Sequence, residues 1–517
     1  MTEASRRVTA AAKVICLAVD SAERDLILRW SEEGVLPTFR WLQTAAARCA
    51  PEGFPGIANH GMWPSFFTAV SPARHGRYAP AQLVPGGYQV RRCGVDDVRR
   101  APFWSALSAA GRRVAVVNVP KAPLSEDLNG LQLADWGTHD YDFDGIRSWP
   151  PDLAAAVEAR YGRDTMGKCD HRRLGGIEDY RVFHAGLVER VRRSADFAVD
   201  TLSQGPWDLF LMAFGDSHCV GHQCWHLHDP AHQHHDPEIA AALGNPVRDI
   251  YVAIDAALGR ILACAGPETQ VLVFVGPGME ANYTGNLLLD PILRRLEGAY
   301  DETRRTPTDV LRAAYNRLPM ACQRPLGYWA RRTHVATVDR DRRRRLCFSV
   351  PNHSFYGAIR LNLIGREPDG RLAPGAAGDA LCRRLTADLL KLTNLDSGKP
   401  AVRRVIRSAD VLRGEYIDAL PDLFVEWDRA GPIARVGSPE IGELHRPHAM
   451  RRSGDHTNHC LLYASGPGIV PGPIKAPVSI VDIAPTIAAH LGVRLDDIDG
   501  RAVPALVPAK APVTLPG

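Results

Sequence analysis

Two histidines, His218 and His222, stand four residues apart just after an apolar run, Trp207–Phe214. The run follows Gly205-Pro206 and predicts a buried strand. If a helix begins directly after it, the two imidazoles lie one turn apart on one face, where they can chelate a divalent cation. Ligands of open α/β sheets bind at the carboxyl ends of strands, where this helix would begin. A helix that carries histidines for other reasons explains the pair alone equally well, so other segments must decide.

Composition is that of an ordinary globular protein. The 517 residues are 45% hydrophobic and 23% charged, and the net charge of +4 argues for neither a nucleic-acid nor a membrane partner. No segment approaches 18 uninterrupted apolar residues, and the first twelve residues do not resemble a signal peptide. The arginine-rich segment 331–345 is interpreted as a solvated face rather than a phosphate or nucleic-acid patch.

Eleven cysteines are scattered along the chain, without a paired framework. This usage suits a reducing compartment, and we expect a cytoplasmic protein.

Strand-like and helical patterns alternate along most of the chain. The strand candidates are 14–19, 114–119, 209–214, 271–275 and 460–464, and the helical patterns include 152–161, 182–201, 247–263 and 376–392. This alternation predicts a doubly wound α/β fold with a mostly parallel sheet and helices on both faces. We expect 12–293 and 353–503 to form its core, 294–352 an inserted cap, and the proline-rich 504–517 an extended tail.

Four further segments carry polar residues that could complete a site. They are the strand ending at Asp20, the stretch Asn59–Gly76, the stretch Val271–Met279, and Gly454-Asp-His456 with the later Ser465-Gly-Pro-Gly468 and Asp482-Ile-Ala-Pro-Thr486. An acid at the carboxyl end of a strand is a common metal or catalytic position, although a helix cap explains it equally well in isolation.

In this order, the segments resemble the alkaline phosphatase superfamily, most closely its type I phosphodiesterase/nucleotide pyrophosphatase branch, from Val14 to Val493. The resemblance implies phosphoryl transfer at two bridged divalent cations, often zinc, with a Thr or Ser nucleophile. Asp20 matches the family's first-strand carboxylate, His222 the His of its Asp-x-x-x-His pair, and His456 its late His. His218 stands where that pair has Asp, which leaves a nitrogen-rich site suited to zinc.

The chain departs from the family at two places. Asn59 occupies the nucleophile position, and a carboxamide cannot form the phospho-enzyme ester; Ser65 and Thr68 are possible substitutes, but the alignment places both on the following helix. Gly276 and Pro277 replace two ligands of the second cation. We therefore expect one divalent cation rather than two.

Other polar residues near these segments leave alternatives open. The tract 226–236 is rich in histidine, which suits a solvated loop or a metal site. Asn282 and Tyr283 either line a substrate pocket or belong to a turn, and Asp216 either orients His218 or His222 or caps a helix.

The leading hypothesis is a metal-dependent hydrolase of a small phosphate ester, most plausibly a phosphodiester or a nucleotide-like pyrophosphate. With Asn59 at the nucleophile position, a water activated by zinc could attack directly, since zinc lowers the pKa of bound water to about 7. The alternatives are another metal-assisted reaction by a repurposed family member and a non-catalytic binding protein.

Overall fold

The chain is described by a computed structural model over residues 12–137, 145–164, 166, 174–298, 340–446 and 452–507. These residues fall into two compact units. The first lies within Met1–Tyr78, Gly94–Asn282 and Met450–Gly517, and the second within Ala79–Cys93 and Tyr283–Ala449.

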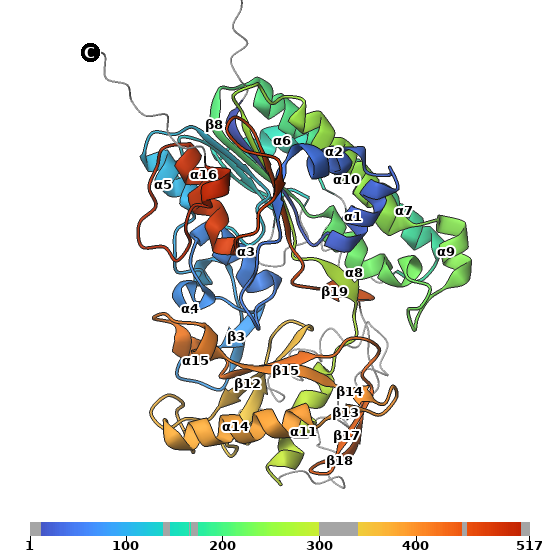
Figure 1. Cartoon of the computed structure of the whole chain (residues 1–517), viewed down its shortest axis with the longest axis vertical. Coiled ribbons are helices and arrows are strands. Elements are labelled where there is room, and N and C mark those ends of the chain that lie inside the picture. The colour runs from blue at the N-terminus through green and yellow to red at the C-terminus, as the bar shows by residue number, and fades with distance from the viewer. Residues whose placement is uncertain are drawn as a thin grey trace, which may run out of the picture. The chain divides into compact units, whose positions relative to one another are not determined.

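A nine-stranded sheet forms the centre of the first unit, in the order β21-β2-β20-β9-β1-β8-β5-β6-β7 (Figure 1). Its strands are β1 (Ala12–Val19), β2 (Ala47–Cys49), β5 (Val114–Val117), β6 (Gly130–Ala134), β7 (Arg147–Trp149), β8 (Trp207–Phe214), β9 (Gln270–Val275), β20 (Leu461–Ser465) and β21 (Gly472–Pro473). β1 pairs in parallel with β8 and β9, and β5 pairs in parallel with β8 and β6, whereas β20 runs antiparallel to β9. The mostly parallel sheet predicted from the strand–helix alternation is confirmed.

Helices cover both faces of this sheet. They are α1 (Arg24–Glu32), α2 (Pro37–Ala45), α3 (Asn59–Thr68), α4 (Pro72–His75), α5 (Phe103–Ala109), α6 (Leu153–Tyr161), α7 (Ile177–Ser203), α8 (Asp216–His228), α9 (Pro237–Leu243), α10 (Pro246–Leu262) and α16 (Ile483–His490). In Figure 1, α3, α5 and α16 lie on one side of the sheet and α1, α2, α7 and α10 on the other. Val14, Cys16 and Ala18 of β1 pack in one core with Phe66 of α3. Since side chains alternate along a strand, the intervening buried residues of β1 face the other helical layer.

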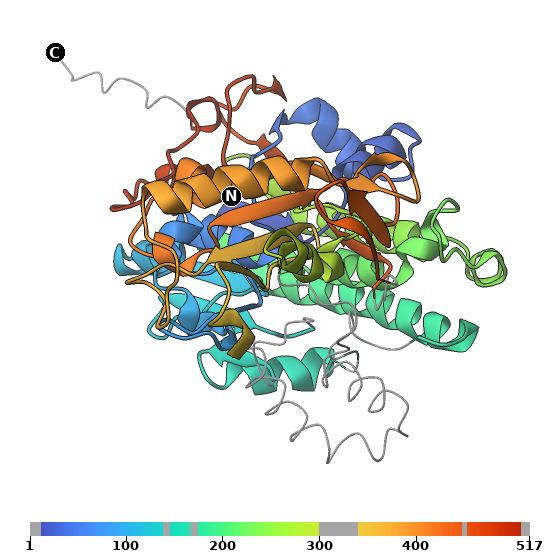
Figure 2. The ribbon, with the colours of Figure 1, turned by 90° about the horizontal axis from the view of Figure 1, so that it is seen from below.

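The second unit has its own antiparallel sheets and core. Its elements are β3 (Ala81–Leu83), β4 (Val90–Arg92), α11 (Asn286–Leu296), β11 (Cys347–Val350), β12 (Tyr356–Leu361), α14 (Ala376–Leu390), β13 (Thr393–Asn394), β14 (Lys399–Pro400), β15 (Val402–Arg407), α15 (Ser408–Val411), β16 (Leu423–Trp427), β17 (Arg435–Ser438) and β18 (Gly442–His445). Its described strands form a four-stranded sheet in the order β11-β12-β16-β15, a second in the order β14-β13-β17-β18, and the pair β3-β4. Helix α14 lies along the first of these sheets (Figure 2). Leu385 and Leu389 of α14 pack with Ile359 of β12 and Ile292 of α11.

The division of the chain differs from the one expected from the sequence. Residues 353–446 were expected in the α/β core, but their strands pair antiparallel with one another and bury a separate core. Most of the expected insertion 294–352 lies outside the described residues, as does the tail from 508 onward. The start of that tail, Pro504–Leu506, is not extended but forms a single 3-10 turn.

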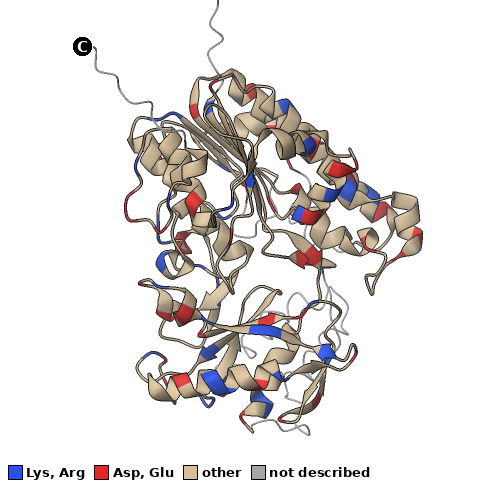
Figure 3. Ribbon diagram, in the orientation of Figure 1, with Lys and Arg blue, Asp and Glu red and all other residues tan. Residues whose placement is uncertain are grey.

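The arginines at the end of the basic segment are bound within the second unit. Arg342 donates hydrogen bonds to the carbonyl oxygens of Tyr88 and Ser349, and Arg345 pairs with Asp290 and Glu297 at 2.6 and 2.9 Å. Arg345 is 4% exposed, so it is a buried structural residue and not part of a solvated face. Figure 3 shows basic and acidic residues interspersed along the helices of both units.

Two further expectations concern the membrane and the cysteines. Over the part of the chain that the structure describes, no helix has the length and apolar character needed to cross a bilayer. Most described cysteines are free thiols, but Cys219 in α8 is disulfide-bonded, contrary to the expectation of unpaired cysteines.

Candidate metal and phosphate site

Helix α8 begins directly after β8 and presents two histidines on its buried face. β8 ends at Phe214, and α8 begins at Asp216, as the apolar run predicts. His218 and His222 are 4% and 0% exposed, and their ring centroids lie 4.4 Å apart. The one-turn spacing therefore places both imidazoles together next to the carboxyl end of a central strand.

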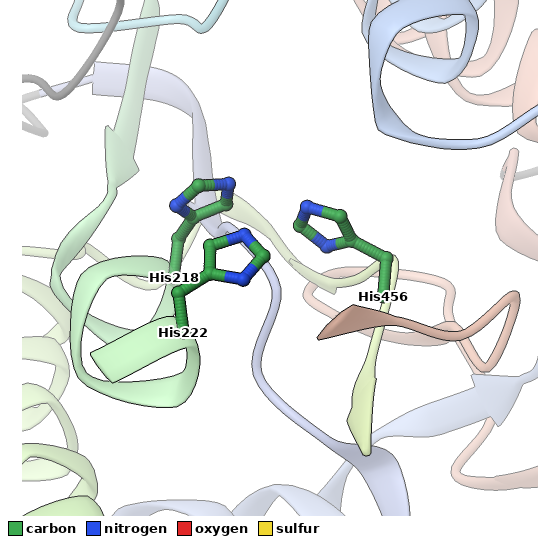
Figure 4. Close-up of side chains that lie close together, drawn as sticks. All are labelled: His218, His222 and His456. Carbon is green, nitrogen blue, oxygen red and sulfur yellow. The ribbon is translucent and has the colours of Figure 1, made fainter. Parts of the chain in front are cut away.

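A short hairpin brings the third histidine to the same place. Strand β10 (Met279–Ala281) follows β9 and pairs antiparallel with β19 (Gly454–His456), so that His456 lies opposite Met279. The His456 ring centroid lies 4.8 Å from those of His218 and His222, and the three rings face one another in Figure 4. One nitrogen of each ring lies within 4.8 Å of the other two. Residues more than two hundred positions apart thus form a group of a size that can hold a metal ion.

Close backbone contact holds the hairpin on α8. The Ser453 amide donates to the His222 carbonyl oxygen at 2.7 Å, and Nδ1 of His222 bonds the Gly454 carbonyl oxygen at 2.6 Å. A Cβ on Gly454 would lie 2.3 Å from the Gly221 carbonyl oxygen and 3.0 Å from Cβ of Trp225. Only glycine permits this approach, so the position of His456 depends on Gly454.

The donor set fits a zinc-like cation. Because a carbonyl oxygen only accepts hydrogen bonds, Nδ1 of His222 carries the proton and Nε2 keeps its lone pair. This carbonyl contact is the one that usually orients a metal-binding imidazole. Three buried imidazoles match the nitrogen ligands that zinc prefers.

Asp20 lies beside this group and organises Asn59. Asp20 directly follows β1, and its main-chain oxygen accepts a hydrogen bond of 2.6 Å from the Ser217 hydroxyl, next to His218. Its Oδ1 accepts hydrogen bonds from Trp63 Nε1, Ser21 Oγ and Asn59 Nδ2, at 3.0, 2.9 and 3.2 Å. Oδ1 of Asp20 therefore has three donors from the chain itself, and none of the metal-sized groups among the described residues includes Asp20.

The pairing with Asp20 determines the orientation of the Asn59 amide. A carboxylate only accepts, so Asn59 must turn its nitrogen toward Asp20. Asn59 is 2% exposed, and among the described residues its Oδ1 has no hydrogen-bond partner. The amide thus leaves a buried acceptor at the position that the sequence resemblance assigns to the family's nucleophile.

Burial makes the Asp20 carboxyl a weaker acid. Loss of solvent raises the pKa of Asp20 to about 6, although hydrogen bonds from Trp63 and Ser21 and the positive charge of Lys121 oppose the rise. Lys121 is 5% exposed and follows β5 with a φ of 63°. Lys121 has no recognisable motif around it, so the sequence alone does not indicate this position.

Glu23 occupies the space beside the degenerate motif after β9. Its Oε2 accepts hydrogen bonds from the Met279 amide and the Thr457 hydroxyl, at 2.9 and 3.1 Å. A Cβ on Gly278 would lie 2.2 Å from that oxygen. The carboxylate therefore fastens the β10–β19 hairpin to the loop after β1, and no side chain at Gly276 or Gly278 provides a metal ligand.

Neither replacement nucleophile is in an activated state. The Arg77 amide donates to Nδ1 of His75 at 3.2 Å, so Nε2 carries the proton that faces Ser65 Oγ at 3.0 Å. Burial also lowers the pKa of His75 to about 3, which makes it a poor base. The Thr68 hydroxyl donates to the Pro64 carbonyl oxygen at 2.6 Å within α3. A covalent ester on Ser65 or Thr68 lacks the neighbouring base that such a nucleophile needs.

The other polar residues that the sequence offered as candidates contact residues outside the histidine group. Asp216 pairs with Arg190 at 2.6 Å rather than with a histidine, and His226 lies 3.3 Å from the Tyr180 hydroxyl, outside the metal-sized group. Asn282 donates to the Arg452 carbonyl oxygen at 3.1 Å. Tyr283 is 8% exposed and belongs to the second unit. A substrate-binding role for Asn282 and Tyr283 stays a prediction.

We predict that Gly454→Ala weakens zinc binding at least tenfold, because the added methyl group would push His456 away from α8. Zinc affinity measured by competition with a chelator checks this result. Gly94→Ala is the matched control, since its methyl group meets nothing within 4 Å. Unchanged zinc affinity in Gly454→Ala would show that the hairpin contact does not position a ligand.

His459 should make stability depend on pH near neutrality. Its Nδ1 lies 3.0 Å from Glu23 Oε1, and this contact raises the pKa of His459 above its ordinary value. The stabilisation is complete below the unfolded pKa of about 6.5 and is lost as pH rises through the higher folded pKa. We predict that His459→Gln is less stable than the parent protein at pH 6 and that the difference shrinks at higher pH in urea unfolding. A difference that is constant with pH would contradict the ion pair.

Comparison with solved structures shows the fold. Alkaline phosphatase PafA aligns with 96% of this chain over 99% of its own length, with a TM-score of 0.52 and 13% sequence identity. Phosphonoacetate hydrolase from Sinorhizobium meliloti aligns over 93% of this chain and 96% of that chain, with a TM-score of 0.51 and 12% identity. Human ectonucleotide pyrophosphatase/phosphodiesterase 5 aligns with 94% of this chain over 97% of its own length, with a TM-score of 0.49 and 12% sequence identity. A comparison with curated proteins gives no match.

Residues 14–345 of the 517 match the family described as type I phosphodiesterase / nucleotide pyrophosphatase. This segment contains Asp20, Asn59, His218 and His222, whereas His456 lies beyond it. Since the match extends over more than half of the chain, the protein belongs to the type I phosphodiesterase/nucleotide pyrophosphatase family of the alkaline phosphatase superfamily.

Proposed function

We propose that this protein is a hydrolase of phosphodiesters or nucleotide-like pyrophosphates that works with one divalent cation, zinc, and without a covalent intermediate. The observation that carries the proposal is the group of His218, His222 and His456, whose ring nitrogens lie within 4.8 Å of one another. When bound there, the cation would polarise the phosphoryl group and lower the pKa of a water molecule.

The chain's own residues support a single cation. Among the described residues, the second-cation position keeps only Asp20 as a strong donor, and Oδ1 of Asp20 already accepts three hydrogen bonds. Gly276 and Pro277 carry no ligand atoms in their side chains, and Glu23 is bound to the hairpin backbone and to Thr457. Of the donors that the resemblance assigns to a second cation, the side chain of Asp20 therefore remains, and its Oδ1 is engaged by the chain itself.

Asn59 would act on the attacking water rather than on the phosphoryl group. Its amide nitrogen faces Asp20 and is therefore not oriented to donate to a phosphoryl oxygen. The amide oxygen is the atom without a partner among the described residues, and an oxygen can accept a hydrogen bond from water. In this role Asn59 would orient the water for an in-line attack.

The stereochemical course at phosphorus tests this mechanism. A single displacement inverts the configuration of a chiral phosphorothioate diester, whereas two displacements through an enzyme ester retain it. We predict inversion by the zinc-loaded protein, together with about a hundredfold loss of kcat in Asn59→Ala. Net retention, or a phosphoryl adduct on Ser65 or Thr68, would contradict the water mechanism. The absence of turnover on diesters, pyrophosphates, monoesters and sulfate esters would contradict the hydrolase itself.

Asn59→Thr is a companion test of the single-cation site. The substitution restores the hydroxyl of the family's nucleophile but not the ligands lost at Gly276 and Pro277. We expect one zinc ion per chain and little gain in turnover. Two ions and a large gain would show that the second site had survived.

A further inference from the structure

Arg452, just before β19, contacts the atom of His222 that is oriented for a cation. Its Nη1 lies 3.3 Å from Nε2 of His222. Since Nδ1 of His222 donates to the Gly454 carbonyl oxygen, Nε2 is the acceptor and the guanidinium is the donor. The lone pair on Nε2 can therefore bind either the arginine or a metal ion, but not both at once.

The backbone of Arg452 is tied to the site independently of its side chain. Its carbonyl oxygen accepts a hydrogen bond from Asn282 Nδ2 at 3.1 Å. The amide of the next residue, Ser453, donates a hydrogen bond to the His222 carbonyl oxygen at 2.7 Å. The Ser453 carbonyl oxygen accepts one from the Asn282 amide at 2.9 Å. A change in the Arg452 side chain would thus leave its Cα beside His222, within reach of anything bound at the three histidines.

A cation at the histidines would displace the guanidinium from Nε2. The lone pair cannot serve both partners, and two positive charges a few ångströms apart repel each other. A displaced guanidinium keeps its full charge and five N–H donors, a geometry that matches the oxygens of a phosphoryl group. The shift that metal binding demands would therefore bring the charge and N–H donors of Arg452 to an anion bound next to the metal.

The charge of Arg452 would also compensate for the positive charge of a second cation, for which Gly276 and Pro277 provide no ligands. With one cation, the site has less positive charge to hold a phosphoryl group than a site with two. We propose that Arg452 closes the metal-free site by hydrogen bonding to His222 and, once the cation is bound, binds a non-bridging oxygen of the substrate phosphoryl group. The proposal rests on the proposed function, because it places the phosphoryl group at the histidine site.

The first test measures zinc binding without any turnover. Arg452→Met removes the competing donor and its charge but keeps a long apolar side chain, so zinc should bind about tenfold more tightly than to the parent protein. Arg181→Met is the control for loss of one charge. The side chain of Arg181 on α7 is 53% exposed, and its Nη1 lies 3.6 Å from Oε2 of Glu178. Zinc affinity that is unchanged or weaker in Arg452→Met would overturn the competition.

The second test measures binding of inorganic phosphate to the zinc-loaded proteins by calorimetry. Arg452→Met should bind phosphate at least tenfold more weakly than the parent protein, and Arg452→Lys should recover part of the loss because it restores the charge. Tighter zinc binding with unchanged phosphate binding would overturn the anion-binding role. Weaker binding of both would indicate a purely structural arginine and overturn the proposal.

The two tests separate this inference from the proposed hydrolysis. If the parent protein turns over none of the esters but Arg452→Met shows the opposite changes in zinc and phosphate affinity, the hydrolase proposal fails and the role of Arg452 stands. If the parent protein hydrolyses diesters and Arg452→Met keeps its phosphate affinity, the hydrolase proposal stands and the role of Arg452 fails. A zinc-loaded parent protein that binds no phosphate contradicts the anion site directly.

Discussion

The contact between the β10–β19 hairpin and α8 is the interaction on which the site depends. His218 and His222 follow from one helix, but His456 comes from the far end of the chain and reaches them only through this contact. The Ser453 amide and the Gly454 carbonyl oxygen bond His222 itself, at 2.7 and 2.6 Å. Glycine at 454 lets the two backbones approach, and Glu23 fastens the hairpin from the loop after β1. The same few bonds therefore set the distance between the rings and the proton position on one of them.

The changes relative to the family pattern are mutually consistent. By the sequence resemblance, His218 takes the place of an Asp and adds a nitrogen donor to the first site, while Gly276 and Pro277 offer no side-chain donors to a second. Glu23 fills the space beside Gly278 and binds backbone rather than metal. Asn59, at the position that the sequence resemblance assigns to a hydroxyl nucleophile, donates a hydrogen bond to Asp20. Together these features support the proposed site with one cation, at which Arg452 would supply further positive charge.

Much of this arrangement could be predicted from the sequence, because periodicity and motif order are local signals. The apolar run before Gly215 predicted β8 and the start of α8, and motif order along the chain predicted the family. The separate second unit could not be predicted, since short antiparallel strands with a core of their own resemble strand–helix alternation in a linear reading. Arg452, Glu23 and Lys121 were missed for a similar reason. Each interacts with residues far away in the sequence, and single Arg, Glu and Lys residues carry no pattern that marks such a contact.

The number and environment of bound zinc ions test the central claim most directly. Elemental analysis combined with X-ray absorption at the zinc edge reports both in solution. The single-cation site predicts one zinc per chain, with three imidazole nitrogens at about 2.0–2.1 Å and the remaining position filled by a light atom. Two zinc ions per chain, or a coordination shell without three imidazoles, would contradict it.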